Sequence, residues 1–537
     1  MNFFFESKFE LIICLFLATT LFVGCQKIDK SSDIKNKKPN VIFILADDLG
    51  AHDLGFMGSK FYETPNLDAL AKQGTIFTQG YAAAQVCSPS RASILLGKFT
   101  ANHGITDWIG ADYGKSWSDK FNSKIMPPNY KRTLPKEDIT IAEAFKNNGY
   151  KTLFAGKWHL GKGESTPENH GFEVNIGGWE VGNPKGGYYA PWENPKLAYK
   201  YLGENLTKRL AEETGGFIEQ HKDQPFFAFL SFYAVHTPLQ TTEKKWKKYR
   251  EKAIANQTDE PNFISERILP VANKQENPIY AGLVASMDDA VGVLMRKLKA
   301  LNLDKNTIIV FTSDNGGLVS SRYGAFATNN LQLRGGKGYQ WEGGIREPYV
   351  IKVPNLKNKP NTIDYPVSGV DFYPTLLDLA GISPDKTQKI DGISLKPILK
   401  GKNLATRSLF WHYPHYGNQG GEPVSIIRKG NWKLIHYWEN NVDELYNLLV
   451  DIGEKNNVIT QNEVIAVSLR KELDTFLADS KAEFPEINPN FDAKKSEKTI
   501  ATRKQKMIKN LEKRRLQILD ENFKPNKDWY NSALTKD

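Results

Sequence analysis

Apolar runs with the character of strands alternate over residues 38–385 with segments of helical spacing, and this alternation restricts the fold more than any other feature. Each run ends in polar residues, and the four clearest are 40–50, 151–161, 225–239 and 306–317. Strands that alternate with helices along the chain are typical of a layered α/β domain built on a mostly parallel sheet. With 537 residues, of which 40% are hydrophobic, the chain is long enough to bury a large core.

The pattern changes after residues 391–401. Short aromatic segments at 408–413 and 425–438 predict a smaller antiparallel sheet, and 464–479 predicts one helix that covers it. We therefore expect four regions along the chain. They are a signal peptide at 1–24, a large α/β/α domain at 38–385, an α+β subdomain at 386–487 and a basic peripheral tail at 488–537.

The N-terminus predicts export. Residues 11–23 form an apolar run that is too short to cross a bilayer but fits the core of a signal peptide. Gly24 and Cys25 follow, which resembles a bacterial lipoprotein signal with Cys25 as the first, lipid-bearing residue of the mature chain. Phe22 and two acidic residues near the start depart from that pattern, so ordinary signal cleavage stays an alternative. The expected location is the periplasm or cell surface of a Gram-negative bacterium, with a lipid anchor in the outer membrane.

The formal net charge of +10 is concentrated in the tail. Residues 494–515 contain ten Lys or Arg and two Glu, so the rest of the chain is close to neutral. A basic tail without a recognised nucleic-acid motif is typical of a solvated extension. We therefore expect no nucleic-acid partner.

Polar side chains follow each of the four predicted strands. They are Asp47 and Asp48, then Lys157 and His159, then His236, and finally Asp314 and Asn315. Each group alone is consistent with an ordinary turn. Ligands of open α/β sheets bind beyond the carboxyl ends of the strands, so four such ends predict one shared cleft. The carboxylate and amide oxygens suit a hard cation, Ca²⁺ or Mg²⁺, rather than Zn²⁺.

Cys87 stands apart from the other two cysteines, Cys14 and Cys25, because both lie within the first 25 residues. Export and lipidation would leave Cys87 as the one free cysteine of the mature chain, so no internal disulfide is expected. Pro89 fits the first turn of a helix, which places Cys87 at the helix start, where free N–H groups favour an anion. A buried, inert cysteine is the usual alternative, but polar neighbours (Ser88, Ser90) argue against it here.

Together these segments resemble the type I sulfatases of the alkaline phosphatase superfamily. CSPSR followed by ASILLGKFTANHG is similar to the C-x-P-x-R signature of that family. ADDLG, GKWHLG, HTPL, SDNGG and LRGGKGYQWEGGIREP match other family segments in order, and the similarity runs from about residue 38 to 450. The resemblance implies a sulfatase domain at 38–385 that hydrolyses sulfate esters.

The resemblance also implies that Cys87 is a precursor, which a formylglycine-generating enzyme oxidises to formylglycine (3-oxoalanine). One hydroxyl of the hydrated aldehyde would attack sulfur and displace the alcohol, and deprotonation of the other would then expel sulfate and restore the aldehyde. The cation, Ca²⁺ with Mg²⁺ as the alternative, would be held by Asp47, Asp48, Asp314 and Asn315 together with residue 87.

Matching the motifs assigns the remaining roles. Arg91 would hold the side chain at position 87, while Lys157 and Lys337 would bind sulfate oxygens as point charges. His159 would take the proton in the elimination step. His236 would contact sulfate and is a candidate to protonate the leaving oxygen, with Lys337 as the alternative.

The expected substrate is a sulfated polysaccharide or oligosaccharide. The loop 177–195 contains Trp179, Tyr188, Tyr189 and Trp192, which we expect to stack on sugar rings or to pack down as a lid. The alternatives are a phosphoester or phosphonate hydrolase of the same superfamily, a catalytically silent glycan-binding lipoprotein, and a lipid-anchored structural protein. The last of these leaves the polar site unexplained.

Overall fold

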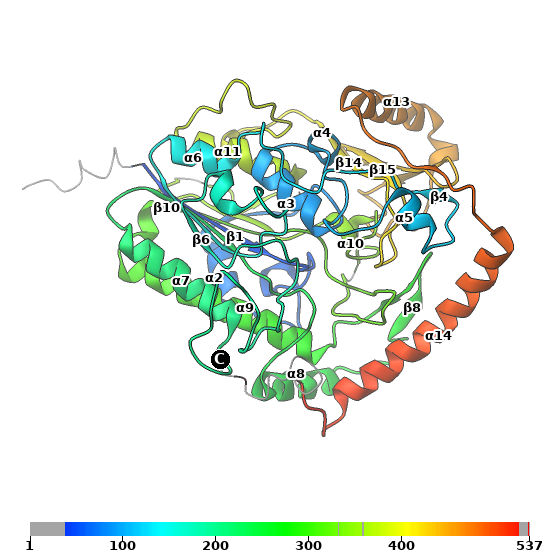
Figure 1. Cartoon of the computed structure of the whole chain (residues 1–537), viewed down its shortest axis with the longest axis horizontal. Coiled ribbons are helices and arrows are strands. Elements are labelled where there is room, and N and C mark those ends of the chain that lie inside the picture. Colours follow the sequence, from blue (N-terminus) through cyan, green and yellow to red (C-terminus); the bar gives the residue numbers. More distant parts are fainter. Residues whose placement is uncertain (1–37, 331, 357–358, 526–534, 536–537) are drawn as a thin grey trace, which may run out of the picture. The chain divides into compact units, whose positions relative to one another are not determined.

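Seven of the eight strands of the large sheet come from the alternating region before residue 355, and β1 (Asn40–Ala46) lies near the centre of the sheet (Figure 1). The computed structural model describes residues 38–525, except 331 and 357–358, and residue 535. The predicted signal segment and Cys25 lie outside the described residues. The sheet runs in the order β12-β2-β11-β10-β1-β7-β5-β6. Its strands are β1 (Asn40–Ala46), β2 (Thr75–Phe77), β5 (Lys151–Gly156), β6 (Val174–Ile176), β7 (Phe226–Ser231), β10 (Thr307–Ser313), β11 (Tyr349–Lys352) and β12 (Thr362–Ile363).

The centre of this sheet is parallel. β10, β1, β7, β5 and β6 pair in parallel, and only β11 runs antiparallel to its two neighbours. Every residue of β1 is buried, as expected for a parallel strand covered on both faces. The predicted α/β class with a mostly parallel sheet is confirmed.

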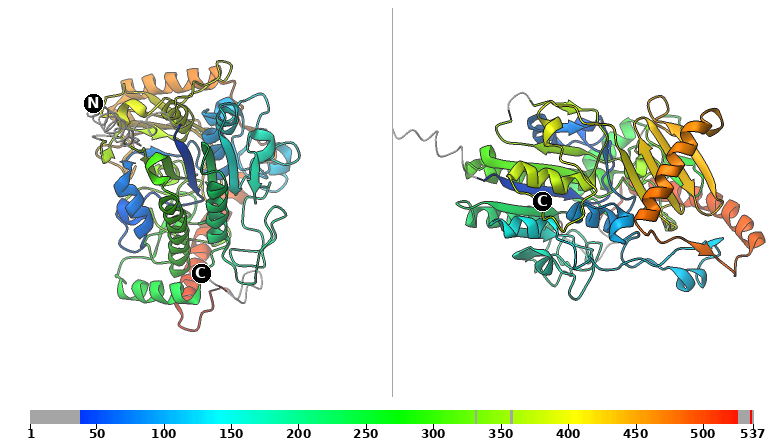
Figure 2. Two further views of the ribbon diagram at one scale, coloured as in Figure 1. Left: turned by 90° about the vertical axis from the view of Figure 1, so that its left-hand side faces the viewer. Right: turned by 90° about the horizontal axis from the view of Figure 1, so that it is seen from above.

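Helices cover both faces of the sheet (Figure 2). One face packs against α2 (Pro65–Gln73), α7 (Leu206–Gln220) and α9 (Pro278–Ala300), with α8 (Glu243–Ala255) packed on α9. The other packs against α3 (Cys87–Leu96), α6 (Ile141–Asn147) and α11 (Phe372–Ala380). The longest of these helices, α9, starts where the Asn277 side chain accepts hydrogen bonds from the backbone N–H groups of Ile279 and Tyr280, with Pro278 in the first turn. It is apolar enough to span a membrane, but it is largely buried in the core.

A second, antiparallel sheet follows in the chain, as predicted. It contains β14 (Ser408–Tyr413), β15 (Val424–Lys429), β16 (Trp432–Tyr437) and β17 (Val442–Asn447) in that order. Helix α13 (Glu463–Asp479) covers it, with Leu469, Leu473 and Leu477 buried against the strands. Where the subdomain boundaries fall stays a prediction.

The tail differs from our expectation of a peripheral extension. Helix α14 (Ala493–Leu519) packs along β8 (Phe263–Ser265), β9 (Pro270–Ala272) and α9. Met507, Leu511 and Ile518 lie on its buried face. The lysines of the helix whose burial is described occupy other positions, so the overall charge obscured an apolar stripe of helical spacing.

Candidate active site

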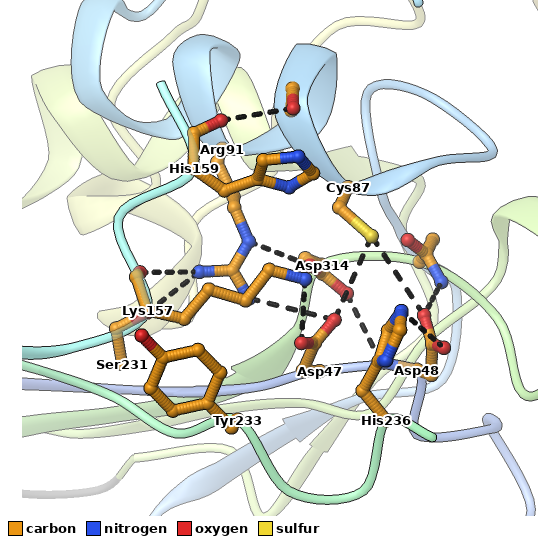
Figure 3. A network of polar contacts seen from close by, with 12 residues as sticks. Asp47, Asp48, Cys87, Arg91, Lys157, His159, Ser231, Tyr233, His236 and Asp314 are labelled. Atoms are coloured by element: carbon orange, nitrogen blue, oxygen red, sulfur yellow. Dashed lines mark hydrogen bonds and ion pairs between the residues drawn. The ribbon is translucent and has the colours of Figure 1, made fainter. Parts of the chain in front are cut away.

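The polar residues that follow the four central strands meet at one edge of the sheet (Figure 3). β10, β1, β7 and β5 are consecutive parallel neighbours, so their carboxyl ends lie side by side. Lys157 Nζ reaches Asp47 Oδ2 at 2.6 Å across two strands, and Asp48 N–H donates to Asp314 Oδ1 at 3.2 Å. The structure thus brings together the residues that the sequence placed in one cleft.

Cys87 is the first residue of α3 and faces this cluster. Its Sγ lies 3.7 Å from Asp47 Oδ1, 4.0 Å from Asp48 Oδ1 and 3.4 Å from Lys337 Nζ. The residue is only 3% exposed, and burial raises the pKa of the thiol to about 12. An unmodified Cys87 would therefore be a neutral thiol and a weak nucleophile at neutral pH.

The polar neighbours of Cys87 are buried too, which the sequence interpretation did not anticipate. Ser88 Oγ donates to the His159 carbonyl at 2.9 Å and accepts from the Ile109 N–H at 3.0 Å. The start of α3 is therefore polar because it is tied to the loop after β5 and to the loop before α5 (Gly114–Ser118), and not because it faces solvent.

Three cations pair with the three carboxylates. Lys157 bonds Asp47, Lys337 Nζ lies 2.7 Å from Asp48 Oδ1, and Arg91 Nε lies 2.8 Å from Asp314 Oδ2. Burial raises the pKa of Asp47, and Asp314 adds to this effect. Burial would also raise the pKa of Asp48, but Lys337, His236 and Lys157 together hold it below its usual value. The paired charges explain how so many ionised groups share a buried site.

The set has the properties of a cation site. Asp47, Asp48, Cys87 and His236 each offer one ligand atom, and these atoms lie within 4.8 Å of one another. Asn315 donates its amide to Asp48 Oδ1 at 2.9 Å, while its buried Oδ1 has no hydrogen-bond partner among the described residues. Buried amide oxygens are nearly always satisfied, so an unpaired one beside carboxylates is suited to bind a cation. Oxygen donors of this kind suit Ca²⁺ or Mg²⁺.

Arg91 is held in place by Asp314, Ser231 and the Lys157 carbonyl, and its expected role of holding the side chain at position 87 stays a prediction. Its Nε bonds Asp314, and one terminal nitrogen donates to the Lys157 carbonyl at 2.9 Å and to Ser231 Oγ at 2.7 Å. The other terminal nitrogen lies 3.7 Å from Asp47 Oδ1. Arg91 therefore orients Asp314 and joins the ends of β5 and β7, a role that the sequence did not predict.

Two histidines flank the cluster in neutral form. His236 Nδ1 lies 2.6 Å from the Thr237 carbonyl, so Nδ1 carries the proton, and Nε2 points to Asp48 Oδ2 at 3.7 Å. Burial, assisted by Lys337, lowers the pKa of His236 to about 3. His159 contacts the Ile109 carbonyl through Nε2, while its buried Nδ1 has no hydrogen-bond partner in the described part of the chain. Burial lowers the pKa of His159 well below its usual value.

A pocket of about 640 Å³ opens onto Cys87. Asp48, His159, His236 and Lys337 line its floor. Trp108 and Tyr323 line it farther out and are 38% and 85% exposed. The volume lies within the range of pockets that hold small ligands.

The aromatic loop 177–195 does not offer stacking rings as a group. Tyr188, Tyr189 and Trp192 are at most 5% exposed and belong to the core. The Tyr188 hydroxyl lies 2.7 Å from both the Tyr233 and the His236 carbonyl oxygens, so it supports the segment that carries His236. These three rings therefore pack against the protein, which was one of the two roles expected for the loop, and do not stack on a sugar.

The sequence did not indicate Trp108, Tyr323 or the contribution of α14 to the pocket. Trp108 and Tyr323 are single aromatics in loops, and no local pattern distinguishes them from other surface rings. Only the path of the chain brings these loops to the pocket mouth.

The comparisons with known proteins agree with this geometry. The family model described as Sulfatase matches residues 39–382, and the one described as N-sulphoglucosamine sulphohydrolase, C-terminal, matches residues 336–483. A protein named Sulfatase from Formosa agariphila is 30% identical over 85% of this chain and 90% of its own length. An ulvan-active sulfatase from the same organism is 29% identical, over 88% of this chain and 86% of its own.

A solved structure shows the same fold. The crystal structure of Ps i-CgsB in complex with k-i-k-neocarrahexaose has a TM-score of 0.66 and 27% sequence identity, covering 86% of this chain and 97% of that one. The first family model alone covers more than half of the chain, and it contains every polar residue of the cluster around Cys87. The chain therefore belongs to the sulfatase family and is an enzyme that hydrolyses sulfate esters.

Proposed function

We propose that this sulfatase removes sulfate from a sulfated polysaccharide or oligosaccharide, and that it does so with a formylglycine derived from Cys87 and a bound divalent cation. One observation carries the proposal: Cys87 lies at the floor of a sugar-sized pocket, in contact with two aspartates and a lysine. Family members in general use a metal ion and formylglycine. Ca²⁺ is the proposed cation, with Mg²⁺ as the alternative.

Asp47, Asp48, Asp314 and Asn315 would hold the cation beside residue 87. When both groups are in place, the aldehyde hydrate supplies a hydroxyl nucleophile and a route for releasing sulfate, and the cation polarises the ester. Arg91 fixes Asp314 in position. Lys157 and Lys337 are charged groups next to residue 87 and would bind the sulfate oxygens, exchanging part of their contact with the aspartates for contact with substrate.

The two histidines have different proton roles in this proposal. Neutral His159 has a free Nδ1 lone pair in the pocket wall, which suits it to accept a proton from residue 87 during sulfate release. His236 holds its proton on the Nδ1 that faces the Thr237 carbonyl, so its Nε2 has none to give in the free enzyme. Lys337 carries a proton. Burial would lower the pKa of Lys337, but its pairing with Asp48 outweighs burial and raises that pKa, so Lys337 holds the proton firmly. The choice between His236 and Lys337 as the donor to the leaving oxygen therefore stays a prediction.

Several observations support a carbohydrate substrate. Trp108 and Tyr323 present exposed rings at the pocket mouth, and such rings commonly stack on sugar faces. The Trp108 ring packs against Gly110, where an added Cβ would lie 2.5 Å from it, and the Trp108 carbonyl accepts a bond from the Tyr130 hydroxyl at 2.8 Å. The similarity to an ulvan-active sulfatase and to Ps i-CgsB in complex with k-i-k-neocarrahexaose supports the same class.

The proposal extends to partners and location. A formylglycine-generating enzyme would modify Cys87. The N-terminal signal would export the chain to the periplasm or cell surface, and a lipid on Cys25 would anchor it to the outer membrane, where external polysaccharides are met. These statements rest on the sequence motifs, which support them at residues 11–25.

The test is sulfate release. Enzyme produced together with a formylglycine-generating enzyme is incubated with ulvan, carrageenan and glycosaminoglycan oligosaccharides, and free sulfate is measured by ion chromatography. We expect sulfate from at least one glycan class and none from the Cys87→Ala variant. Hydrolysis rates of matched aryl sulfate and aryl phosphate esters distinguish a sulfatase from the alternative, a phosphoester hydrolase. Faster turnover of the phosphate, or equal turnover by Cys87→Ala, would overturn the proposal.

A further inference from the structure

The C-terminal helix α14 forms part of the active-site pocket. Arg514 and Ile518, one helical turn apart, line the same pocket as Cys87 and Lys337. In Figure 1, α14 runs beside β8 and ends near α8. The helix lies beyond the residues that either family model matches, 39–382 and 336–483. Arg514 therefore lies outside both matched segments.

The turn of α14 that carries Arg514 is firmly placed. Arg515 forms a two-pronged ion pair with Glu276, with nitrogen to oxygen distances of 2.7 and 2.9 Å. Two side chains of α8 cap the end of α14, where Trp246 Nε1 donates to the Ile518 carbonyl and Arg250 Nε to the Leu519 carbonyl. Free carbonyl groups at a helix end need such partners. These contacts fix the direction in which Arg514 projects.

Arg514 differs from its neighbour in charge balance. Arg515 is neutralised by Glu276 and Glu512. In the described part of the chain, no acidic side chain pairs with Arg514, whose one recorded contact is with the Phe523 ring at 5.7 Å. Its side chain is half-buried in the pocket wall. A guanidinium so placed is a ready partner for a sulfate or a carboxylate, because its planar fork can donate two hydrogen bonds to either.

We propose that Arg514 is a specificity-determining residue that binds a second anionic group of the substrate, a sulfate or a carboxylate other than the ester being cleaved. This inference rests on the proposed function, since it assigns a subsite to the same sugar-binding pocket. It predicts that the enzyme prefers sugars with two anionic groups over sugars with the scissile sulfate alone. Removal of Arg514 abolishes that preference.

Binding to the inert Cys87→Ala protein tests the inference without turnover. Calorimetric titration compares monosulfated with disulfated forms of galactose, glucosamine and galactosamine. A second comparison uses monosulfated disaccharides with an intact or a reduced uronic carboxylate, which shows whether sulfate or carboxylate is the preferred group. Because a charge-assisted bidentate contact is strong, we expect the doubly anionic member of a pair to bind about tenfold tighter or better.

Three second substitutions in the Cys87→Ala background complete the design. Arg514→Gln removes the charge and should reduce the ratio of the two dissociation constants to about one. Arg514→Lys keeps a cation and should retain part of the ratio. Lys513→Gln, an exposed residue of the same helical turn outside this pocket, is the matched control and should leave the ratio unchanged.

The outcomes separate the two proposals. Failure of Cys87→Ala to bind any of the sulfated sugars would contradict the proposed function itself. Equal affinity for singly and doubly anionic sugars would overturn the Arg514 subsite alone. The subsite would also be overturned if the ratio of dissociation constants stayed unchanged in Arg514→Gln. It would be overturned as well if the ratio fell equally in Lys513→Gln, because the preference would then come from the general positive charge of the helix.

Discussion

At the scale of single residues, the site is a set of opposite charges arranged around one unreactive thiol. Each of Asp47, Asp48 and Asp314 is paired with its own cation, and Asn315 keeps an unsatisfied oxygen beside them. Three buried carboxylates would repel one another strongly without such partners. The three carboxylates and three cationic side chains therefore nearly cancel, and a divalent cation and an incoming sulfate ester would add charges of opposite sign to the site.

Asp314→Asn tests the ligand assignment. The substitution removes one charged oxygen from the cation site, so we expect metal content, measured by plasma mass spectrometry, to fall well below one ion per chain. Activity should fall by more than about 100-fold. Asp371→Asn is the matched control, because Asp371 is also buried and paired with an arginine, Arg407, but lies outside the site. Full metal content in Asp314→Asn would show that the assignment is wrong.

The buried side chain of His103 makes the stability of the protein depend on pH. Its Nδ1 accepts from the Ile105 N–H at 3.1 Å and its Nε2 faces Ser93 Oγ at 3.0 Å, away from the pocket. Burial lowers the pKa of His103 from 6.5 to about 3. Between pH 6.5 and 3, the histidine therefore binds a proton in the unfolded chain but not in the folded chain. The free energy of unfolding due to this group falls by about 1.4 kcal/mol per pH unit as pH drops from 6.5 towards 3.

Urea unfolding of the wild type and of His103→Gln measures this effect. The variant should be less stable at pH 8, because it loses two buried hydrogen bonds, and the gap between the two proteins should narrow by about 1 kcal/mol on going to pH 5.5. Parallel stability curves over that range would show that folding does not lower the pKa of His103.

At the scale of helices and strands, a buried lysine joins the small sheet to the main domain. Lys433 on β16 is fully buried, with Nζ 2.7 Å from Glu454 Oε1 and 3.2 Å from Glu342 Oε1. Glu342 begins α10 (Glu342–Ile345), directly after the loop that carries Lys337, and also accepts from the Tyr81 hydroxyl at 2.6 Å. The small sheet therefore helps to position the loop that supplies Lys337 to the active site.

Lys433→Met should be strongly destabilising. It removes the cation that two buried carboxylates share, and Glu342 keeps only the more distant Arg346 at 3.6 Å. Removal of one partner from a buried ion pair typically costs about 3–5 kcal/mol. The comparison is Lys429→Met at the end of β15, where an exposed pair with Glu472 is worth less than about 1 kcal/mol. Both values come from urea unfolding of purified proteins. A small loss for Lys433→Met, similar to that for Lys429→Met, would mean that the carboxylates take up protons or water at little cost.

At the scale of the whole molecule, the sequence predicted what local pattern determines. The alternation of strand and helix indicated the sheet, and the polar residues after its four central strands indicated the cluster, because parallel strands must bring their carboxyl ends together. Trp108, Tyr323 and Arg514 could not be found this way. Their positions depend on how loops and the tail pack from far along the chain, and the charge of the tail hid the apolar stripe of α14.

The account as a whole depends on Cys87 being the precursor of the reactive group. The most direct measurement is the mass of the tryptic peptide that contains residue 87, from protein produced together with a formylglycine-generating enzyme. Conversion of the thiol to an aldehyde predicts a loss of about 18 Da at Cys87, in step with sulfate release. An unmodified thiol in protein that still releases sulfate would contradict the account.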